Sequence, residues 1–377
     1  MHIALVSHNI VRGDGQGRVN VELARYLSEQ GHRVHLIADR VEPRLVDIGC
    51  TWHPVHPGFD GVDLLKVARF PRMADAALRR LEDKIDVTIA CGVVLSRPHT
   101  VNAVHFVHGP WLESDHHNSK HATGVQRLYQ YVFSSLNARW ERRTFAAAQR
   151  VVAVSPMVKQ ELLEIGVPDE KITVIVNGVD LDEFAPGPAD RQSLDLPDGP
   201  ALGLFVGDIK SPIKNLDTVL RALPRVPDLH LAVAGDSNGS PYPLLADELG
   251  IADRVHFLGF RRDIADLMRA ADFFLLPSRR DSCPLVLLEA LASGLPIIAS
   301  SQVGNAPLLE NGAGFVLSDP EDVEALTDHA TALSSDPSLR RRMSRAARAV
   351  AETHSWDRMA AEYLRVLRNP APSRIPA

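Results

Sequence analysis

The stretch LPSRRDSCPLVLLEALASGLP, residues 276–296, carries more information about the fold than any other part of the sequence. It begins at the end of the short apolar run Phe273–Leu276, which has the length and composition of a buried strand. Pro284 suits the first position of a helix, because the N–H group that proline lacks would have no partner there. A buried strand followed by an apolar helix predicts a βα unit of a parallel sheet.

Two acidic residues of this stretch suit a polar ligand. Asp281 precedes the predicted helix, and Glu289 lies within it with apolar neighbours on all sides. We therefore expect the Glu289 carboxylate to be buried and to accept hydrogen bonds, for which ribose hydroxyls are suitable donors. The backbone N–H groups of Leu285 and Val286, at the start of the helix, would point at an anion.

The alternation of strand and helix extends from this stretch in both directions, which predicts parallel sheets covered by helices on both faces. We expect strands at Ile3–Ser7, Val34–Ala38, Val87–Cys91, Val101–Val107, Val151–Ser155, Thr173–Val176, Leu202–Val206, Leu229–Ala234, Val255–Leu258, Phe273–Leu276 and Pro296–Ser300. We expect helices at Arg18–Gln30, Val125–Ala148, Asn215–Leu223, Leu244–Leu249, Ile264–Ala270, Pro284–Ala292, Glu321–Ser334, Pro337–Thr353 and Trp356–Arg368.

The length of 377 residues favours two domains, because single hydrophobic cores stop growing at roughly 250–300 residues. A candidate linker lies at 184–200, where six of 17 residues are Pro or Gly. We therefore predict an α/β protein with two doubly wound parallel sheets, the first domain ending at 184 and the second beginning at 185. Such sheets bind ligands outside the carboxyl ends of their strands, and a cleft between two of them suits two substrates.

The composition excludes several classes of protein. Hydrophobic residues make up 45% and charged residues 23%, which is typical of a globular chain. With a net charge of −6, the chain has no overall electrostatic reason to bind nucleic acid. Its three cysteines are too few for a disulfide framework. No secretion signal and no apolar run of about 20 residues is visible, so we expect a cytoplasmic protein.

Two further loops suit an anion. Gly13, Gly15 and Gly17 follow the first strand and would let the backbone approach a ligand at the start of the next helix. Their even spacing departs from the G-x-G-x-x-G pattern of dinucleotide-binding proteins, which disfavours NAD. In the second half, Lys210 and Lys214 lie where a strand crosses to a helix, and their ammonium groups suit a diphosphate.

Together these segments resemble retaining glycosyltransferases of the GT-B fold, in the group often called group 1 or family 4 (GT4). The residues that carry the resemblance are Gly15, Gly17, Ser155-Pro156, Asn177–Asp180, Asp281–Pro296 and Ser355–Arg358. The resemblance implies two Rossmann-like domains that face a central cleft. It also implies that the last helix returns to the first domain, so that the N-terminal, acceptor-side domain comprises 1–184 and 356–377, and the nucleotide-sugar-binding domain comprises 185–355.

The resemblance implies roles for single residues. Glu289 would bind the ribose of the sugar nucleotide, and Asp281 would accept hydrogen bonds from hydroxyls of the donor sugar. Lys214 would hold the diphosphate, and His108 would lie near the reacting sugar and the acceptor. The implied catalytic residues are thus His108, Lys214 and Asp281, with no metal ligand. The other implied donor-binding residues are Gly15, Gly17, Lys210, Cys283, Pro284, Leu285 and Val286.

Two positions depart from the family pattern. The family usually has Glu at the position of Asp281, which is a conservative change with a shorter reach, and the second departure bears on the phosphates. An arginine often follows the strand glycine in the family, six positions before the lysine, and here Asp208 follows Gly207. A carboxylate cannot hold a phosphate, so we expect the diphosphate site to rely on Lys214, with Lys210 as a substitute.

The implied reaction moves a hexose-type sugar from a nucleotide-diphosphate sugar, with a UDP-sugar favoured, to a hydroxyl acceptor with retention. We expect metal-independent, front-face substitution without a cofactor, and no nucleic acid partner. The acceptor would be a sugar, a lipid-linked glycan or a small molecule. Two alternatives stay open: a sugar-nucleotide epimerase of the same fold, and a catalytically silent sugar-nucleotide-binding protein.

Three other features have a structural and a functional interpretation. Asp180 and Asp182 match the D-x-D pattern of metal-dependent glycosyltransferases, but we expect them in a turn without a metal. We also expect no metal at the polar histidine cluster, which comprises His116, His117 and His121. The helix at 126–145 mixes aromatic residues with arginines, which suits either a core helix with a solvated face or a helix at a membrane surface. A peripheral contact with the inner face of the membrane therefore stays open.

Overall fold

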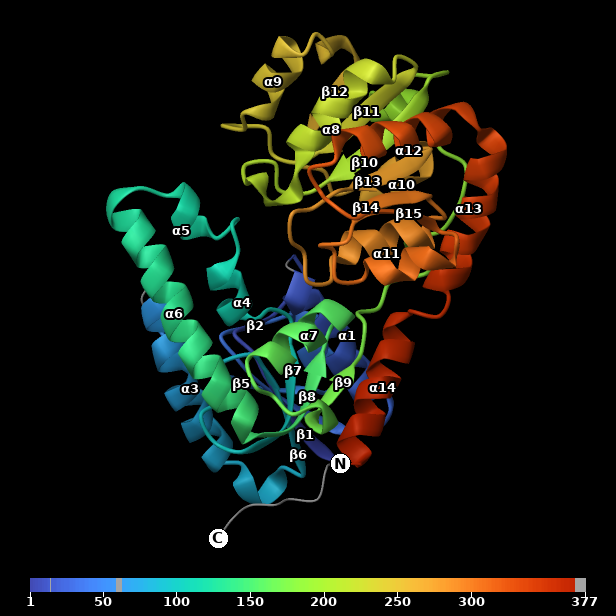
Figure 1. Ribbon diagram of the computed structural model, residues 1–377. Helices are drawn as coiled ribbons and strands as arrows, with labels where there is room; N and C mark the ends of the chain where they lie inside the picture. Colours follow the sequence, from blue (N-terminus) through green and yellow to red (C-terminus); the bar gives the residue numbers. More distant parts are fainter. Residues whose placement is uncertain (14, 59–62, 370–377) are drawn as a thin grey trace. The chain divides into compact units, whose positions relative to one another are not determined.

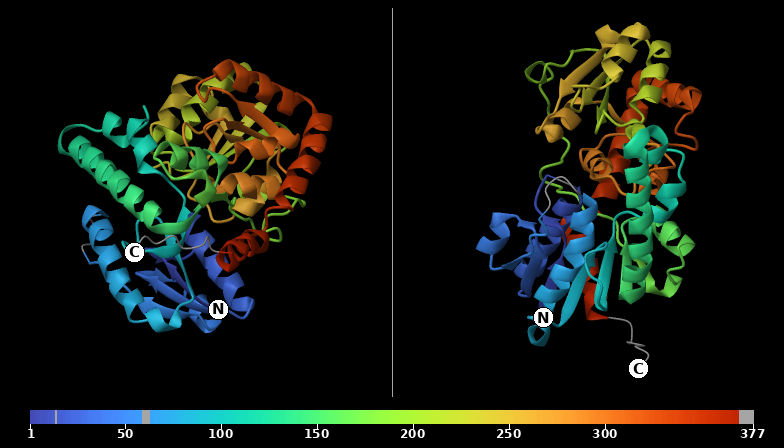
Figure 2. Two further views of the ribbon diagram at one scale, coloured as in Figure 1. Left: turned by 60° about the horizontal axis from the view of Figure 1, so that its bottom comes forward. Right: turned by 90° about the vertical axis from the view of Figure 1, so that its left-hand side faces the viewer.

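The computed structural model describes residues 1–13, 15–58 and 63–369, and the chain folds into two compact units. Unit 1 consists of Met1–Asn177 and Trp356–Ala377, and unit 2 consists of Gly178–Ser355 (Figure 1). Each unit has its own parallel β-sheet packed against helices (Figure 2). The α/β class and the doubly wound sheets predicted from the alternation of strands and helices are confirmed.

The sheet of unit 1 has seven parallel strands in the order β5-β3-β1-β6-β7-β8-β9. The order reverses between β1 and β6, and a doubly wound sheet opens a ligand crevice where its order reverses. The strands are β1 (His2–Val6), β3 (Arg33–Ala38), β5 (Thr51–Pro54), β6 (Val87–Cys91), β7 (His99–Val104), β8 (Ala148–Ala153) and β9 (Ile172–Val174). A separate short pair consists of β2 (Asn9–Ile10) and β4 (Arg40–Val41).

Helices cover both faces of this sheet. On one face Phe70 of α3 is fully buried in a cluster with Ala4 and Val6 of β1. Ile3 and Leu5 alternate with these residues and are also fully buried, so the opposite face is covered as well. The helices are α1 (Gly15–Glu29), α2 (Pro43–Asp47), α3 (Asp63–Arg79), α4 (His108–Glu113), α5 (Asn118–His121), α6 (Gly124–Ala147), α7 (Pro156–Glu164) and α14 (Trp356–Arg368).

The last helix, α14, lies in unit 1, where it packs against α1. Its apolar face is buried at Trp356 and Tyr363, among other positions. An ion pair of 2.6 Å between the Arg25 guanidinium of α1 and the Asp357 carboxylate of α14 adds a polar contact. The chain therefore leaves the first unit after Asn177 and returns to it at Trp356.

The sheet of unit 2 has six parallel strands in the order β12-β11-β10-β13-β14-β15, which reverses between β10 and β13. The strands are β10 (Ala201–Val206), β11 (Leu229–Ala234), β12 (Val255–Gly259), β13 (Phe273–Leu276), β14 (Ile297–Ser300) and β15 (Gly314–Leu317). The helices are α8 (Leu216–Ala222), α9 (Tyr242–Glu248), α10 (Ile264–Ala270), α11 (Leu285–Ala292), α12 (Val323–Ser335) and α13 (Pro337–Ala351). Phe205, Phe273 and Leu275 lie in the core between the sheet and the helices.

The structure corrects several predicted element ends. The strand expected at 101–107 ends at Val104, and α1 begins at Gly15 instead of Arg18. Pro284 lies one residue before α11, as its N-cap, and not inside its first turn. The sequence did not predict the helices α2, α3, α4, α5 and α7 or the strands β2, β4, β5 and β15. Three of these have an evident cause: α3 contains Pro71, β5 is polar, and β15 begins with a glycine. Each of these departs from the residue pattern by which its element type is recognised.

The Pro- and Gly-rich segment 184–200 is part of unit 2 and not a link between the units, because the units separate after Asn177. Arg191 fixes the segment by donating hydrogen bonds to the Asp272 carboxylate at 2.9 Å and to the Ala270 carbonyl oxygen at 2.9 Å. Leu194 and Leu196 are buried. Pro and Gly correctly predicted that this segment has little regular structure. The segment is nevertheless packed within unit 2 and is not a linker.

Candidate active site

The candidate residues of unit 2 come from loops that follow β10 and β13, the two strands at which the order of the sheet reverses. The β10–α8 loop carries Lys214, and the β13–α11 loop carries Asp281. The Lys214 ammonium and the Asp281 carboxylate form an ion pair. Their side chains are 25% and 15% exposed, so the pair is largely withdrawn from solvent. Two residues 67 positions apart in the chain thus meet at one edge of the sheet.

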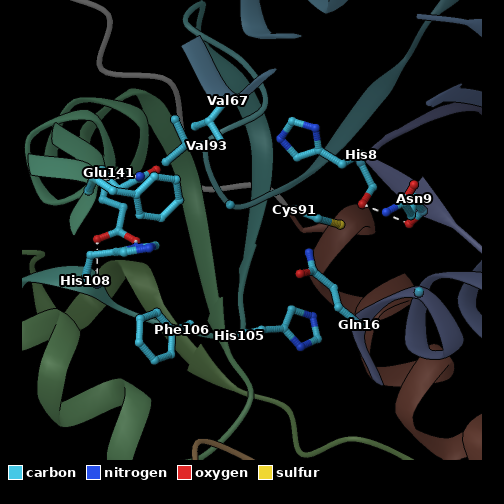
Figure 3. A pocket seen from close by; sticks show the side chains of 15 residues that line it. His8, Asn9, Gln16, Val67, Cys91, Val93, His105, Phe106, His108 and Glu141 are labelled. Atoms are coloured by element: carbon cyan, nitrogen blue, oxygen red, sulfur yellow. Dashed lines mark hydrogen bonds and ion pairs between the residues drawn. The ribbon is translucent and has the colours of Figure 1, made fainter. Parts of the chain in front are cut away.

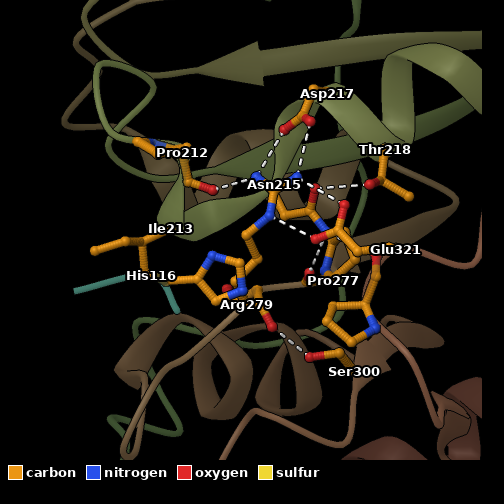
Figure 4. Close-up of polar contacts among 12 residues, drawn as sticks. His116, Pro212, Ile213, Asn215, Asp217, Thr218, Pro277, Arg279, Ser300 and Glu321 are labelled. Carbon is orange, nitrogen blue, oxygen red and sulfur yellow. Dashed lines mark hydrogen bonds and ion pairs between the residues drawn. The ribbon is translucent and has the colours of Figure 1, made fainter. Parts of the chain in front are cut away.

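Backbone geometry fixes the position of Lys214. Lys214 ends a short 3-10 turn, and the following Asn215 is left-handed, with φ of 62°. The fully buried Asn215 amide donates to the carbonyl oxygens of Pro277, at 2.9 Å, and Pro320, at 2.7 Å (Figure 4). Its amide oxygen accepts from the Thr218 hydroxyl at 2.7 Å. A side chain with both donors and an acceptor therefore ties the β10–α8 loop to the loop after β13.

Arg279 is a functional-site neighbour that the sequence reasoning missed. Arg279 is 9% exposed, and its guanidinium forms a two-pronged contact with Asp217, at 2.9 and 2.8 Å, and another with Glu321, at 2.6 and 2.8 Å (Figure 4). Burial alone would lower the pKa of Arg279, but hydrogen bonds to these carboxylates raise it above its usual value. Arg279 also donates to the Pro212 carbonyl oxygen at 2.5 Å, two residues before Lys214. The only sequence signal for this role was the pair of adjacent arginines Arg279-Arg280, and such a pair is equally typical of a solvent-exposed loop.

The helix α11 carries Glu289, which is half-buried. The residue is thus less buried than its apolar neighbours Leu287, Leu288 and Ala290 on the same helix, and a buried, hydrogen-bonded carboxylate stays a prediction. Cys283 and Pro284 are buried just before the helix, and Leu285 and Val286 are half-buried in its first turn. The Asp281 backbone N–H donates to the Gln302 carbonyl oxygen at 2.9 Å, and the Asp281 carbonyl oxygen accepts the Gly304 N–H at 2.7 Å, so both backbone groups of Asp281 are fixed.

Lys210 does not join the pair of Lys214 and Asp281. Its ammonium, on a side chain that is 48% exposed, pairs with Asp236 at 2.5 Å. Asp208, at the position where an arginine was expected from the family pattern, is exposed and accepts a hydrogen bond from the Lys210 backbone N–H at 2.9 Å. Asp208 therefore shapes the loop that carries Lys210.

In unit 1 a cavity of about 230 Å³ lies at the carboxyl ends of β1, β6 and β7 (Figure 3). It is lined by Ser7, His8, Asn9, Gln16, Gly17, Val67, Cys91, Gly92, Val93, His105, Phe106, His108, Phe133, Asn137 and Glu141. Of the glycines predicted for this site, Gly17 lines the cavity and Gly15 begins α1. The sequence predicted both glycines in a loop, but both lie in the first turn of α1.

His108 lines this cavity and is held by Glu141 of α6, a residue that the sequence reasoning did not single out. The Glu141 carboxylate is 2.6 Å from His108 Nδ1 and accepts the His108 backbone N–H at 2.9 Å (Figure 3). Glu141 is 3% exposed, and the His108 ring packs edge-on against Phe106 and Phe133. A carboxylate on Nδ1 favours a proton there and leaves Nε2 as the nitrogen suited to a substrate. The sequence signal for Glu141 was the recurrence of polar residues at positions 134, 137, 141 and 144, which places them on one face of the helix.

Two other histidines in the cavity are neutral at pH 7. Burial lowers the pKa of His8 to about 4, although the nearby Asp39 opposes this shift. Burial also lowers the pKa of His105 to about 4, and His105 Nε2 is buried without a hydrogen-bond partner among the residues described. Burial raises the pKa of the Cys91 thiol to about 12, so it acts as a hydrogen-bond donor to Asn20 and not as a nucleophile.

The remaining features of the sequence have structural explanations. Both ring nitrogens of His117 contact serine hydroxyls, Ser119 and Ser134, each at 2.8 Å. The Asp180 carboxylate accepts two backbone N–H groups of its own turn. Over the described ranges, no three His, Cys, Asp or Glu side chains gather in a way that could hold a metal ion. No helix in those ranges is both long enough and apolar enough to span a bilayer.

Comparison with curated proteins finds several named D-inositol 3-phosphate glycosyltransferases. The one from Mycobacterium avium is 37% identical over 250 residues, which cover 62% of this chain and 59% of the relative. The one from Xylanimonas cellulosilytica is 34% identical over 63% of this chain and 60% of the relative. The matching part thus spans about three fifths of the length of these relatives.

Among solved structures, similar folds include WaaG, a glycosyltransferase involved in lipopolysaccharide biosynthesis, with a TM-score of 0.76 and 20% identity over 98% of this chain and all of that one. Sucrose-phosphate synthase from Thermosynechococcus elongatus gives a TM-score of 0.78 and 19% identity, with 98% of both chains covered. HepE from Anabaena, solved with UDP and glucose, gives a TM-score of 0.72 and 19% identity, with 98% of this chain and all of that one covered. At such identities the likeness establishes the fold, which is GT-B.

The family models divide the chain much as the two units do. The model of glycosyltransferase family 4 matches residues 13–183, and the model of the glycosyl transferases group 1 matches residues 187–350. Together they leave only short segments unmatched. The chain therefore belongs to the group 1 glycosyltransferases of family 4.

Proposed function

We propose that this protein transfers a sugar from a nucleotide-diphosphate sugar, with a UDP-sugar favoured, to a hydroxyl acceptor with retention of anomeric configuration. The bond between C1 of the sugar and the diphosphate oxygen breaks while the acceptor oxygen bonds to C1 on the same face. The proton of the acceptor hydroxyl passes to the departing phosphate oxygen, so the reaction needs no nucleophile from the protein and no metal.

The single observation that carries the proposal is the ion pair of Lys214 and Asp281 where the strand order of unit 2 reverses. A nucleotide-diphosphate sugar presents a dianion next to a polyhydroxylated ring. An ammonium beside a carboxylate offers a partner for each part, the phosphates for Lys214 and the sugar hydroxyls for Asp281. Lys214 would also stabilise the charge that grows on the diphosphate as it departs.

The other donor-binding roles follow from the same placement. The half-buried Glu289 on α11 would accept hydrogen bonds from the ribose, and the first turn of α11 would offer the N–H groups of Leu285 and Val286 to the donor. Buried Cys283 and Pro284 would shape the loop. Lys210 would reach the phosphates only by exchanging its pair with Asp236.

The cavity of unit 1 supports an acceptor role for the first unit. His108, oriented by Glu141, would present Nε2 to a hydroxyl near the reacting carbon, and Gly17 would leave room for the donor phosphate beside Gly15. The curated relatives are named for D-inositol 3-phosphate, which is therefore the first acceptor to test. HepE, solved with UDP and glucose, supports UDP as the first nucleotide.

Removing the Lys214 ammonium tests the donor site. We expect Lys214→Ala to lower turnover more than tenfold, because charge-assisted contacts of this kind contribute about 1.5–3 kcal/mol. Lys214→Arg should restore part of the rate. Arg225→Ala is a matched control, since Arg225 forms an exposed ion pair with Glu324 beyond the far end of α8.

Lys214→Ala also leaves the Asp281 carboxylate without its partner, so the double variant Lys214→Met/Asp281→Asn separates charge loss from misfolding. Calorimetric titration with UDP-, GDP- and ADP-sugars, followed by hydrolysis and transfer assays, measures binding and turnover. A near-normal rate in Lys214→Ala refutes the role of the ammonium. Binding without turnover for every acceptor tried would favour the silent binding protein, and epimerised donor would favour the epimerase.

The stereochemistry needs its own experiment. We expect NMR of the first-formed product to show the anomeric configuration of the donor, because attack and departure occur on the same face. An inverted product rules out front-face substitution. This outcome would leave the family assignment intact, since that assignment rests on the whole chain.

A further inference from the structure

A second cavity, of about 340 Å³, lies in unit 2 at the opposite edge of the sheet from Lys214 and Asp281. Residues 271–272, directly before β13, and residues 295–296, directly before β14, form part of its lining. The other walls come from the segment at 186–187 and from the helices α10 and α13, which are labelled in Figure 1. The cavity therefore lies at the amino ends of the strands whose carboxyl ends carry the candidate donor site.

The Pro- and Gly-rich segment, which has no role in the candidate donor site, forms one closely packed wall of this cavity. A Cβ on Gly187 would lie 3.1 Å from Cδ of Arg269. A Cβ on Gly294, whose φ is 74°, would lie 3.1 Å from both Pro186 Cγ and Ser344 Oγ. A side chain at either glycine would therefore push its neighbours apart, so the wall depends on glycine at both positions.

Positive charge predominates in the lining. The charged side chains that line the cavity are Arg269, Asp272, Arg340 and Arg341. The Asp272 carboxylate is shared by two guanidinium groups, at 2.9 Å from that of Arg191 and 3.3 Å from that of Arg340. One carboxylate between two arginines leaves an excess positive charge, to which Arg269 and Arg341 add. A cavity lined by charge of one sign raises the local concentration of ions of the other sign.

Two of the lining arginines have donors available for a ligand. Within the described part of the chain, the Arg341 guanidinium contacts the Ser338 hydroxyl at 2.9 Å and no carboxylate. Arg269 pairs with Asp266 of its own helix, whose side chain is 54% exposed. Surface ion pairs of this kind contribute little stability, so Arg269 can exchange its partner for a ligand at small cost.

Backbone groups at the two nearest helix ends are already occupied. The N–H groups of Ser338 and Leu339, in the first turn of α13, donate to the Asp336 carboxylate at 2.8 and 3.0 Å. At the end of α11, the Ala292 carbonyl oxygen accepts from Arg348 at 2.9 Å, which reduces its repulsion of an anion. The guanidinium groups, and not the helix ends, therefore determine what this cavity binds.

Helix α11 separates the cavity from the candidate donor site. Pro284 precedes this helix, and Ser293, which lines the cavity, follows it. Its 8 residues span about 12 Å at 1.5 Å per residue. A ligand in the cavity and a donor at the start of α11 can therefore be bound at the same time.

We propose that this cavity binds the phosphate group of a small phosphorylated polyol. A guanidinium presents its N–H groups in a planar fork that matches two phosphate oxygens, and Arg269 and Arg341 would supply two such forks. The Ser344 hydroxyl, on the same wall, would hydrogen-bond the polyol. The volume falls within the range of about 300–1,000 Å³ that is typical of small-molecule sites. The binding does not depend on the reaction proposed above.

Calorimetric titration of the full chain with glycerol 3-phosphate, in the presence of excess UDP, tests the proposal. We expect binding that UDP does not displace and that glycerol, which lacks the phosphate, does not reproduce. Arg341→Gln should weaken this binding at least tenfold, because a charge-assisted contact to the phosphate is lost. Arg342→Gln is the matched control, since Arg342 is the next residue of α13, is exposed and does not line the cavity.

A carboxylate placed in the cavity gives a second test. Ser344→Asp should abolish the binding of glycerol 3-phosphate, because the new carboxylate pairs with the arginines and repels the phosphate. The proposal is overturned if the wild-type chain does not bind glycerol 3-phosphate, if UDP competes with it, or if Arg341→Gln and Arg342→Gln bind it alike. Lys214→Ala should keep this binding, so a failure here is distinct from a failure of the proposed reaction, which the turnover of Lys214→Ala tests.

Discussion

At the scale of single residues, the candidate site is built from charges that already have partners. Lys214 is paired with Asp281, and Arg279 is paired with Asp217 and Glu321. The guanidinium of Arg279 already has two carboxylates and a backbone carbonyl as hydrogen-bond partners within the protein. The Lys214 ammonium has one carboxylate partner and can bind a second anion. This difference in partner number makes Lys214, and not Arg279, the candidate ligand for a diphosphate.

Glu141 offers a prediction for a positioning residue. We expect Glu141→Ala to lower the turnover number about ten- to a hundredfold with little change in the KM for the donor, because His108 loses the carboxylate that orients its ring. Glu141→Gln keeps an oxygen at the same place and should restore much of the rate. Steady-state kinetics on both variants, with the exposed Glu164→Gln as a control, checks this. Equal losses in Glu141→Ala and Glu141→Gln would contradict a positioning role.

At the scale of elements, the site depends on where strands end and helices begin. Parallel strands place their carboxyl ends along one edge, so the β10–α8 and β13–α11 loops must be neighbours once the strands pair. A close approach accompanies this: a Cβ on Gly235 would collide with the Gly207 carbonyl oxygen, so the loop after β11 can pack there only with glycine. A Cβ on Gly207, in contrast, would meet the Lys214 alkyl chain only at ordinary contact distances of 3.4–3.7 Å.

Asn215 gives a prediction about one of these loops. Asn215→Ala should reduce the free energy of unfolding by about 2–4 kcal/mol, because it loses buried hydrogen bonds and because alanine adopts the left-handed region less readily than asparagine does. Asn215→Gly loses the same bonds but removes the backbone strain, so it should be less destabilised by about 1 kcal/mol. Urea denaturation measures both. If the free energy of unfolding falls equally in the two variants, the left-handed backbone at position 215 does not account for any of the loss in Asn215→Ala.

At the scale of the whole molecule, each unit has its own sheet and core, and the chain crosses between the units twice. The crossing at 355–356 lets α14 bury its apolar face in unit 1. A chain cut before Trp356 would lack α14, so it would uncover the surface of α1 against which α14 packs and would lose the ion pair between Arg25 and Asp357. Helix α14 is thus part of the core of unit 1.

The cavity histidines predict how stability depends on pH. His8 and His105 have folded pKa values of about 4, below the value of 6.5 expected for an unfolded chain. Between about pH 6.5 and 4 the unfolded chain binds more protons, so stability is full above pH 6.5 and falls as the pH is lowered. Each histidine contributes a slope of up to about 1.4 kcal/mol per pH unit.

Urea denaturation at several pH values checks this slope. His105→Gln should flatten the dependence between pH 6.5 and 4, whereas the exposed His121→Gln should leave it unchanged. Carboxylates such as Asp217, whose pKa is held low by Arg279 against the effect of burial, lose their contribution at lower pH. An unaltered slope in His105→Gln would show that His105 is not a buried neutral histidine.

The sequence by itself determined the βα alternation, the two parallel sheets and the family, because strand length, apolar composition and the spacing of Asp281 and Glu289 are local properties. It also placed Lys214 and Asp281 on loops after strands. Their pairing, the clamping of His108 by Glu141 and the buried network of Arg279 were decided only by the tertiary structure. These contacts join residues 33 to 67 positions apart. Such contacts depend on which strands lie side by side, and no local pattern encodes that order.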